Sequence, residues 1–197
     1  MWPPSLLSRL VLLPLPLITA CAGLITTTER LDDPVEVYLL EHSPHTTLVL
    51  PTDDGGLVRF KYCDWRWCVE EKRSFPSGAA ALLWPTPSGI GRGQRDDVTA
   101  PQELGNLAPD GIARYHKIMA EREKVRSLIN QLNLAFEDHE GDFFRNESTG
   151  LDFVPYSRGY WLAHQSNLVV AKWLTELGFE VRSYPLLTRW QIESPSE

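Results

Sequence analysis

Ser166 and His45 are the two residues of this chain whose types and positions favour nucleophilic chemistry. Ser166 opens a predicted helix, and His45 begins a strand-like run far upstream. A group at a helix start benefits from the positive end of the helix dipole and from unpaired N–H groups. A serine hydroxyl is too weak an acid to be activated by that field alone, so it needs a base that takes its proton. With His45 as that base, the pair could cleave esters or amides.

Each of these residues also has an ordinary structural interpretation. Serine is a preferred helix N-cap, a role that contributes ~1 kcal/mol, and residue chemistry alone favours this role for Ser166. His164, two residues earlier, is either a rival base or a polar residue before the helix. For His45 the alternative is a strand-end histidine with a local hydrogen bond.

Asp64 is a candidate for the group that orients His45. A turn-rich segment over 52–56 joins two strand-like runs, 48–51 and 57–62, which predicts a hairpin. A four-residue loop would place His45 opposite Asp64, whereas a five-residue loop would place it opposite Cys63. The alternative for Asp64 is an exposed carboxylate near a strand end.

The surrounding pattern predicts the elements that must position these residues. We expect strands over 35–40, 48–51, 57–62, 151–154 and 179–182, and helices over 78–84, 112–138 and 166–177. The segment 85–109 is rich in Pro, Gly and charge, which predicts a long surface loop. This order of strands and helices predicts an α+β fold, a single domain with helices packed on an antiparallel sheet.

The first residues have the features of an export signal. Arg9 precedes an apolar run over 10–18, and Ile18-Thr19-Ala20-Cys21 resembles a bacterial lipobox, which would make Cys21 a lipidated first residue. The rival is cleavage after Ala22, which would release a secreted protein. We therefore expect a signal peptide over 1–20, a tether over 21–34, the domain over 35–190 and a tail over 191–197. This predicts a location in the cell envelope, anchored to a membrane and facing the periplasm.

The composition limits the classes of molecule that this protein could bind. The formal net charge is −7, and removal of Arg9 with the leader makes it −8, which disfavours nucleic acid as a partner. The spacing of His and Cys predicts no metal site, and no cofactor is indicated. Two separate buried thiols are favoured for Cys63 and Cys68, because residues five apart on a straight strand point to opposite faces; a disulfide would need a turn through residues 65–67.

Four segments resemble an uncharacterised bacterial family first noted beside urease gene regions. The first segment runs from Val37 through His45 to Pro51. The second and third are Tyr62-Cys63-Asp64-Trp65-Arg66-Trp67 and the stretch from Ala79 to Pro85. The last runs from His164 through Gly178. The resemblance covers roughly 35–190. That family is similar in pattern to circularly permuted papain-like hydrolases, which include cell-wall amidases and lipid acyltransferases.

The resemblance implies a fold and a site. It implies that His45 is the catalytic histidine and Asp64 the orienting group, and that Ser166 occupies the position of the nucleophilic cysteine. Because Ser166 replaces that cysteine, thiol catalysis is excluded, and Cys63 stands where the family pattern has glycine.

Three functional hypotheses follow. The first is an envelope lipoprotein whose papain-like domain is catalytically impaired and binds a peptide-like, glycan-linked or acyl ligand. The second is an amide or ester hydrolase that uses Ser166 and His45. The third is a structural lipoprotein that contacts a partner through exposed tryptophans.

Overall fold

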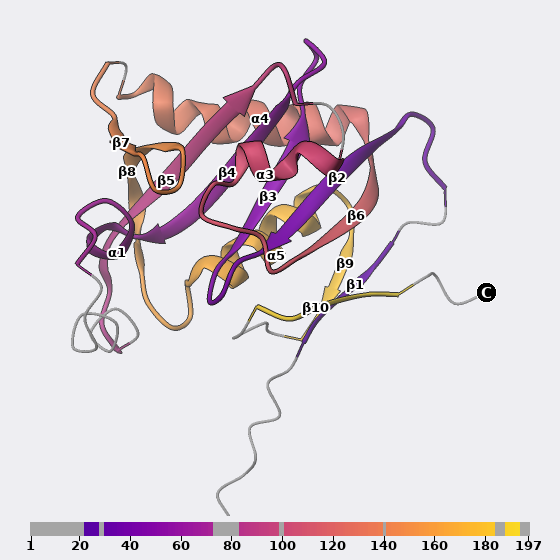
Figure 1. Cartoon of the computed structure of the whole chain (residues 1–197). Helices are drawn as coiled ribbons and strands as arrows, with labels where there is room; N and C mark the ends of the chain where they lie inside the picture. Colours follow the sequence, from indigo (N-terminus) through magenta and orange to yellow (C-terminus); the bar gives the residue numbers. More distant parts are fainter. Residues whose placement is uncertain are drawn as a thin grey trace, which may run out of the picture.

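The computed structural model describes residues 22–27, 30–72, 83–98, 101–139, 141–183 and 188–193. Its centre is a seven-stranded antiparallel sheet in the order β6-β2-β3-β4-β5-β8-β7 (Figure 1). These strands are β2 (Pro34–Glu41), β3 (Thr46–Pro51), β4 (Leu57–Asp64), β5 (Thr86–Arg95), β6 (Arg114–Glu121), β7 (Phe144–Asn146) and β8 (Leu151–Tyr160). The predicted α+β class with an antiparallel sheet and packed helices is confirmed.

Two helices, α4 (Arg122–Glu137) and α5 (Ser166–Glu176), cover one face of this sheet (Figure 1). Helix α5 forms because its apolar residues recur at helical spacing and give it a side that can be buried. The apolar stripe is buried against β3 and β4: Val169, Val170, Trp173, Leu174 and Leu177. On the exposed side, Lys172 and Glu176 form an i,i+4 ion pair at 3.5 Å.

The opposite face of the sheet is covered by a smaller layer. The short helices η1 (Pro101–Glu103) and α3 (Leu104–Leu107) lie there, and Leu104 and Leu107 pack on Tyr38 and Val49. The sheet is therefore covered on both faces.

A second, three-stranded sheet joins the two ends of the described chain. Strand β1 (Gly23–Thr26) lies between β9 (Glu180–Arg182) and β10 (Trp190–Glu193), parallel to β10 and antiparallel to β9. Ile25 of β1 is fully buried in the main core. The segment predicted as a tether thus contains a core strand, and the predicted tail over 191–197 begins inside β10.

The segment predicted as a loop over 85–109 instead contains β5, which pairs with β4 and β8 along most of its length. The glycines of β5 make the strand hard to recognise in the sequence. They are required because neighbouring residues pack closely against the backbone of β5. A Cβ added at Gly91 would lie 2.5 Å from the ring of Phe153 on β8. The prediction was wrong because a residue without a side chain gives no hydrophobic alternation.

The helix predicted over 112–138 begins only at Arg122, and its first part is the edge strand β6. Ile118 and Ala120 of β6 face the core, and the whole strand pairs with β2. No Gly or Pro separates β6 from α4, so the boundary is not visible in the sequence.

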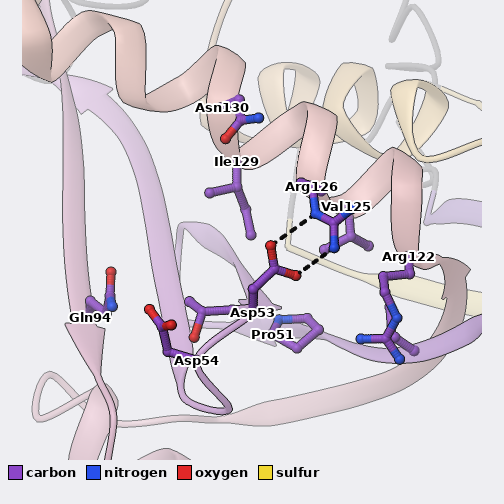
Figure 2. Close-up of a pocket in the computed structure, with 11 residues that line it drawn as sticks. Pro51, Asp53, Asp54, Gln94, Arg122, Val125, Arg126, Ile129 and Asn130 are labelled. Carbon is purple, nitrogen blue, oxygen red and sulfur yellow. Dashed lines mark hydrogen bonds and ion pairs between the residues drawn. The ribbon is translucent and has the colours of Figure 1, made fainter.

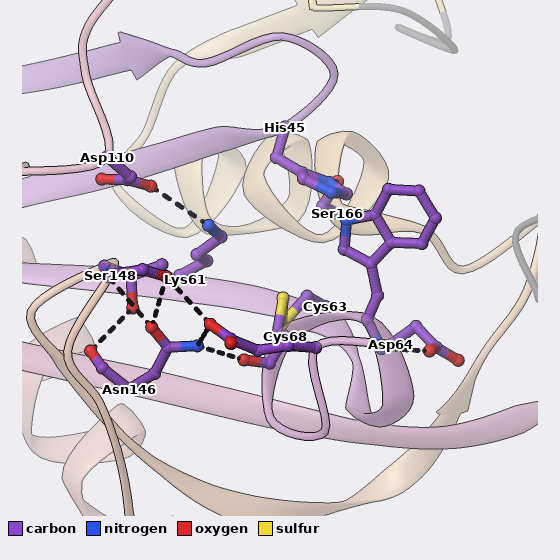
Figure 3. Close-up of a disulfide and its surroundings, with 12 residues drawn as sticks. His45, Lys61, Cys63, Asp64, Cys68, Asp110, Asn146, Ser148 and Ser166 are labelled. Atoms are coloured by element: carbon purple, nitrogen blue, oxygen red, sulfur yellow. Dashed lines mark hydrogen bonds and ion pairs between the residues drawn. A yellow bond between two sulfur atoms is a disulfide. The ribbon is translucent and has the colours of Figure 1, made fainter. Parts of the chain in front are cut away.

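The predicted hairpin of β3 and β4 is confirmed with a five-residue loop, because Pro51 pairs with Leu57. After β4 the chain turns through helix α1 (Trp65–Cys68), which brings the Cα atoms of Cys63 and Cys68 to 6.3 Å and allows a disulfide (Figure 3). The prediction of two separate thiols was wrong, because the strand ends at Asp64. Of the helix predicted over 78–84, only residues 83–84 lie within the described part.

Candidate functional site

The structure brings Ser166 and His45 into hydrogen-bond contact across 121 residues of sequence. The Nδ1 atom of His45 lies 3.1 Å from the Oγ atom of Ser166. His45 lies directly before β3, Ser166 is the first residue of α5, and α5 packs on β3 (Figure 3). This distance meets the requirement for a base that accepts a hydroxyl proton.

Ser166 is not the N-cap of α5. The cap is Gln165, whose side-chain oxygen accepts a hydrogen bond of 2.8 Å from the backbone N–H of Asn167. The capping interpretation of Ser166 was therefore wrong. Its hydroxyl faces His45 while its backbone lies in the first turn, where the helix dipole favours negative charge.

Tyr160, at the end of β8, is the third member of this contact and was not anticipated. Its hydroxyl lies near the side chain and the backbone of Ser166. Burial raises the pKa of Tyr160, although these neighbouring groups of Ser166 lower it. Ser166 is only 1 % exposed, so a ligand reaches its Oγ only if neighbouring groups move. No local motif marks Tyr160, because β8 and α5 meet only in the folded chain.

His164 has a different environment from the one expected of a rival base. Its Nδ1 lies 3.2 Å from the Gly159 carbonyl oxygen and 2.9 Å from the Tyr62 hydroxyl, and its ring packs edge-on against Tyr62. Burial lowers the pKa of His164, and the charge of nearby Arg158 lowers it further. These contacts give His164 a role in holding the turn before α5.

Asp64 does not take the position predicted for it opposite His45. The pairing of β3 and β4, continued one step past the strand, places Cys63 there. The Asp64 carboxylate caps α1, accepting the Trp67 N–H at 2.9 Å, and also accepts the Thr86 hydroxyl. It therefore fixes the turn that carries the disulfide.

A second polar cluster lies on the sheet face that carries α3. The buried Arg59 guanidinium donates to both oxygens of Asp110, at 2.7 and 2.9 Å, and Lys61 donates to the same carboxylate at 3.3 Å. Burial alone would raise the pKa of Asp110, but Arg59 and Lys61 lower it overall. Nearby His42 bonds to Thr47 at 2.9 Å and to the Gly111 carbonyl. These groups satisfy one another, which indicates a structural role.

A pocket of about 200 Å³ lies between the β3–β4 hairpin and α4, away from Ser166 (Figure 2). Arg126 on α4 crosses it and bonds to both oxygens of Asp53, each at 2.9 Å. Both side chains are more than half exposed. Nothing that lines this pocket has the geometry of a nucleophile and base.

The remaining predicted site residue, Cys21, lies outside the described residues, as does the predicted signal peptide. Within the described ranges, no helix is both long and apolar enough to cross a bilayer. The same ranges contain no group of three or more His, Cys, Asp or Glu residues placed to hold a metal ion. We find no match to this chain among protein-family models, curated proteins or solved structures.

Proposed function

We propose that this chain is an envelope lipoprotein whose domain is a permuted papain-like hydrolase of esters or amides. The observation that carries the hydrolase proposal is the 3.1 Å contact between His45 Nδ1 and Ser166 Oγ at the start of a buried helix. The order of a histidine at an early strand followed by a nucleophile at a late helix start supports the permuted papain-like assignment. The lipobox-like sequence ending at Cys21 supports the anchor.

In this proposal the two residues divide the chemistry in the usual way for a nucleophile and its base. Ser166 Oγ attacks the carbonyl carbon while His45 Nδ1 takes the hydroxyl proton and then gives it to the leaving alcohol or amine. Water, deprotonated by His45, then cleaves the acyl-serine and regenerates the hydroxyl. The helix dipole of α5 favours the negative charge that develops beside its first turn.

A second candidate is a domain that binds a peptide-like, glycan-linked or acyl ligand with little turnover. Two observations favour it: the Tyr160 hydroxyl lies near the side chain and the backbone of Ser166, and Ser166 is 1 % exposed. In this structure Tyr160 lies against the groups at the start of α5 that would otherwise be available to stabilise an oxyanion.

An electrophilic fluorophosphonate probe tests the hydrolase proposal. We expect it to label the wild type, to leave Ser166→Ala unlabelled, and to label His45→Ala at least ~10²-fold more slowly, because the hydroxyl then lacks its base. Ser157→Ala, at an exposed serine of β8, is the matched control and keeps wild-type labelling.

Equal labelling of Ser166→Ala and wild type would contradict the hydrolase. The variant Ser166→Cys then separates the two candidates, since a thiol is intrinsically more nucleophilic than a hydroxyl. If the wild type is unlabelled and Ser166→Cys cleaves a p-nitrophenyl ester, the cleft is intact and the binding function holds. If neither reacts, the papain-like assignment fails as well.

A further inference from the structure

Four large apolar side chains gather on the surface next to the Ser166 site. They come from two segments, Leu83-Trp84 before β5 and Trp161-Leu162 after β8, and we call them the aromatic edge. Their exposed fractions are 65 % for Leu83 and Trp84, 39 % for Trp161 and 47 % for Leu162. Burial of such side chains normally stabilises a protein, so their joint exposure indicates a contact surface.

The sheet itself brings the two segments together. Thr86 of β5 pairs with Tyr160 of β8, so the residues before one strand lie beside those after the other. A Cβ at Gly159 would lie 3.4 Å from Pro85 Cβ, which confirms the close approach. Because Tyr160 also contacts Ser166, the aromatic edge borders the candidate site directly.

The composition of this edge fits the interface of a phospholipid bilayer. Tryptophan is enriched at the level of lipid headgroups, where its ring can be partly apolar and partly hydrated. Arg158 is exposed near the end of strand β8, three residues before Trp161. A cation in this position complements anionic lipid headgroups, although the whole chain is acidic.

The N-terminal end of the described chain lies on the same side of the molecule. In Figure 1 the start of β1, the β2–β3 turn that ends at His45, and the connection from β8 to α5 all lie along the lower edge. Only Ala22 separates Cys21 from β1, and one residue spans at most about 3.6 Å. A lipid on Cys21 would therefore be attached close to the start of β1.

We propose that the aromatic edge rests on the surface of an anionic phospholipid bilayer, with Trp84 and Trp161 inserted at the headgroup level. This inference rests on the membrane-anchoring part of the proposed function and not on the chemistry of Ser166. It places the aromatic edge, which lies next to Tyr160, on the membrane side of the molecule.

Quenching of tryptophan fluorescence by brominated lipids tests the proposal. The full chain is purified from the expressing cells, with its N-terminal modification read by mass spectrometry, and is mixed with phosphatidylcholine–phosphatidylglycerol vesicles brominated in the acyl chains. We expect strong quenching of the wild type and loss of more than half of it in the double variant Trp84→Phe/Trp161→Phe. The buried Trp173 and Trp190, 4 % and 1 % exposed, remain unquenched in both proteins.

A pair of leucine variants provides the matched control. Leu162→Asp places a charge in the aromatic edge and should reduce quenching at least twofold, whereas Leu134→Asp, at a 57 % exposed leucine of α4, should leave it unchanged. Equal quenching of wild type and double variant, or an unquenched wild type, overturns the proposal whether or not Cys21 carries a lipid. Ser166→Ala should keep full quenching, so failure of the hydrolase chemistry is detected separately.

Discussion

At the scale of single residues, the buried cluster around Arg59 shows how protonation is linked to folding. His42 sits in that cluster, where burial and, to a smaller extent, the charge of Arg59 lower its pKa from 6.5 to about 4. Its Nδ1 faces the Gly111 carbonyl and its Nε2 lies 3.4 Å from an Arg59 nitrogen, which is the arrangement of a neutral imidazole. The native fold therefore excludes the proton that the unfolded chain takes up.

We predict that His42 makes the protein acid-sensitive. The unfolded histidine binds a proton below pH 6.5 and the native one only below about 4, so stability falls as the pH drops through this window. Between pH 7 and pH 5 the wild type should lose about 2 kcal/mol more unfolding free energy than His42→Gln. Urea titrations at both pH values measure this difference. Parallel losses in the two proteins would show that His42 does not carry the effect.

The site residues show what a sequence can and cannot reveal at this scale. Ser166 and His45 could be selected because each combines a reactive type with a recognisable position at the start of a helix or strand. Asp64 was chosen from the register of a hairpin, and a single additional loop residue placed Cys63 in that position instead. Tyr160 could not be found, because its contact with Ser166 depends on how β8 and α5 meet.

At the scale of elements, helix α1 is a four-residue turn that is held on both sides. The disulfide joins its last residue, Cys68, to β4, and the Asn146 side-chain amide donates a 2.6 Å hydrogen bond to the Cys68 carbonyl (Figure 3). Asn146 belongs to a glycosylation-type sequence, yet its buried amide is used to join α1 to β7. The turn is thereby fixed between two parts of the sheet.

We predict that breaking this bridge destabilises the domain moderately. Cys68→Ala should lower the unfolding free energy by about 2 kcal/mol, because the closed loop is only six residues long and little chain entropy is removed. Urea unfolding with and without dithiothreitol measures this difference. The reductant should lower the unfolding free energy of the wild type by a similar amount and leave that of the variant unchanged. Reaction of both thiols in the unreduced, unfolded wild type would contradict the bridge.

Elements whose apolar residues recur with a clear period could be predicted from the sequence. Elements whose residues are chosen to fit a neighbouring strand could not. The hairpin and α5 follow from alternation and from helical spacing. Strand β5 was missed because Gly91 leaves room for the Phe153 ring, so the requirement is set by a neighbouring strand rather than by its own pattern. Strand β6 was missed because no Gly or Pro separates it from α4.

At the scale of the whole molecule, Trp190 joins the small sheet to the large one. Its backbone N–H bonds to a Glu41 oxygen at 3.0 Å, and its ring N–H bonds to the Thr46 hydroxyl at 3.0 Å. The side chain is 1 % exposed and belongs to the main core. A residue at the border of the predicted tail is thus one of the largest buried groups of the fold.

We predict that Trp190→Ala costs about 3–5 kcal/mol of stability, because it opens a cavity and leaves the Thr46 hydroxyl without its donor. Gln191→Ala, at the exposed neighbour on the same strand, should change stability by less than about 0.5 kcal/mol. Thermal or urea unfolding of the two variants gives the comparison. Equal stability of the two variants would show that Trp190, at the border of the predicted tail, does not stabilise the domain.

The place of β1 between β9 and β10 has a consequence for the timing of folding. Gly23 pairs with Trp190, so the first strand in the sequence finds this partner only after almost the whole chain has been made. Pairings this distant in sequence are slow to form. Strand β1 would therefore join the fold late, and the C-terminal strand β10 would close the domain from the opposite end of the chain.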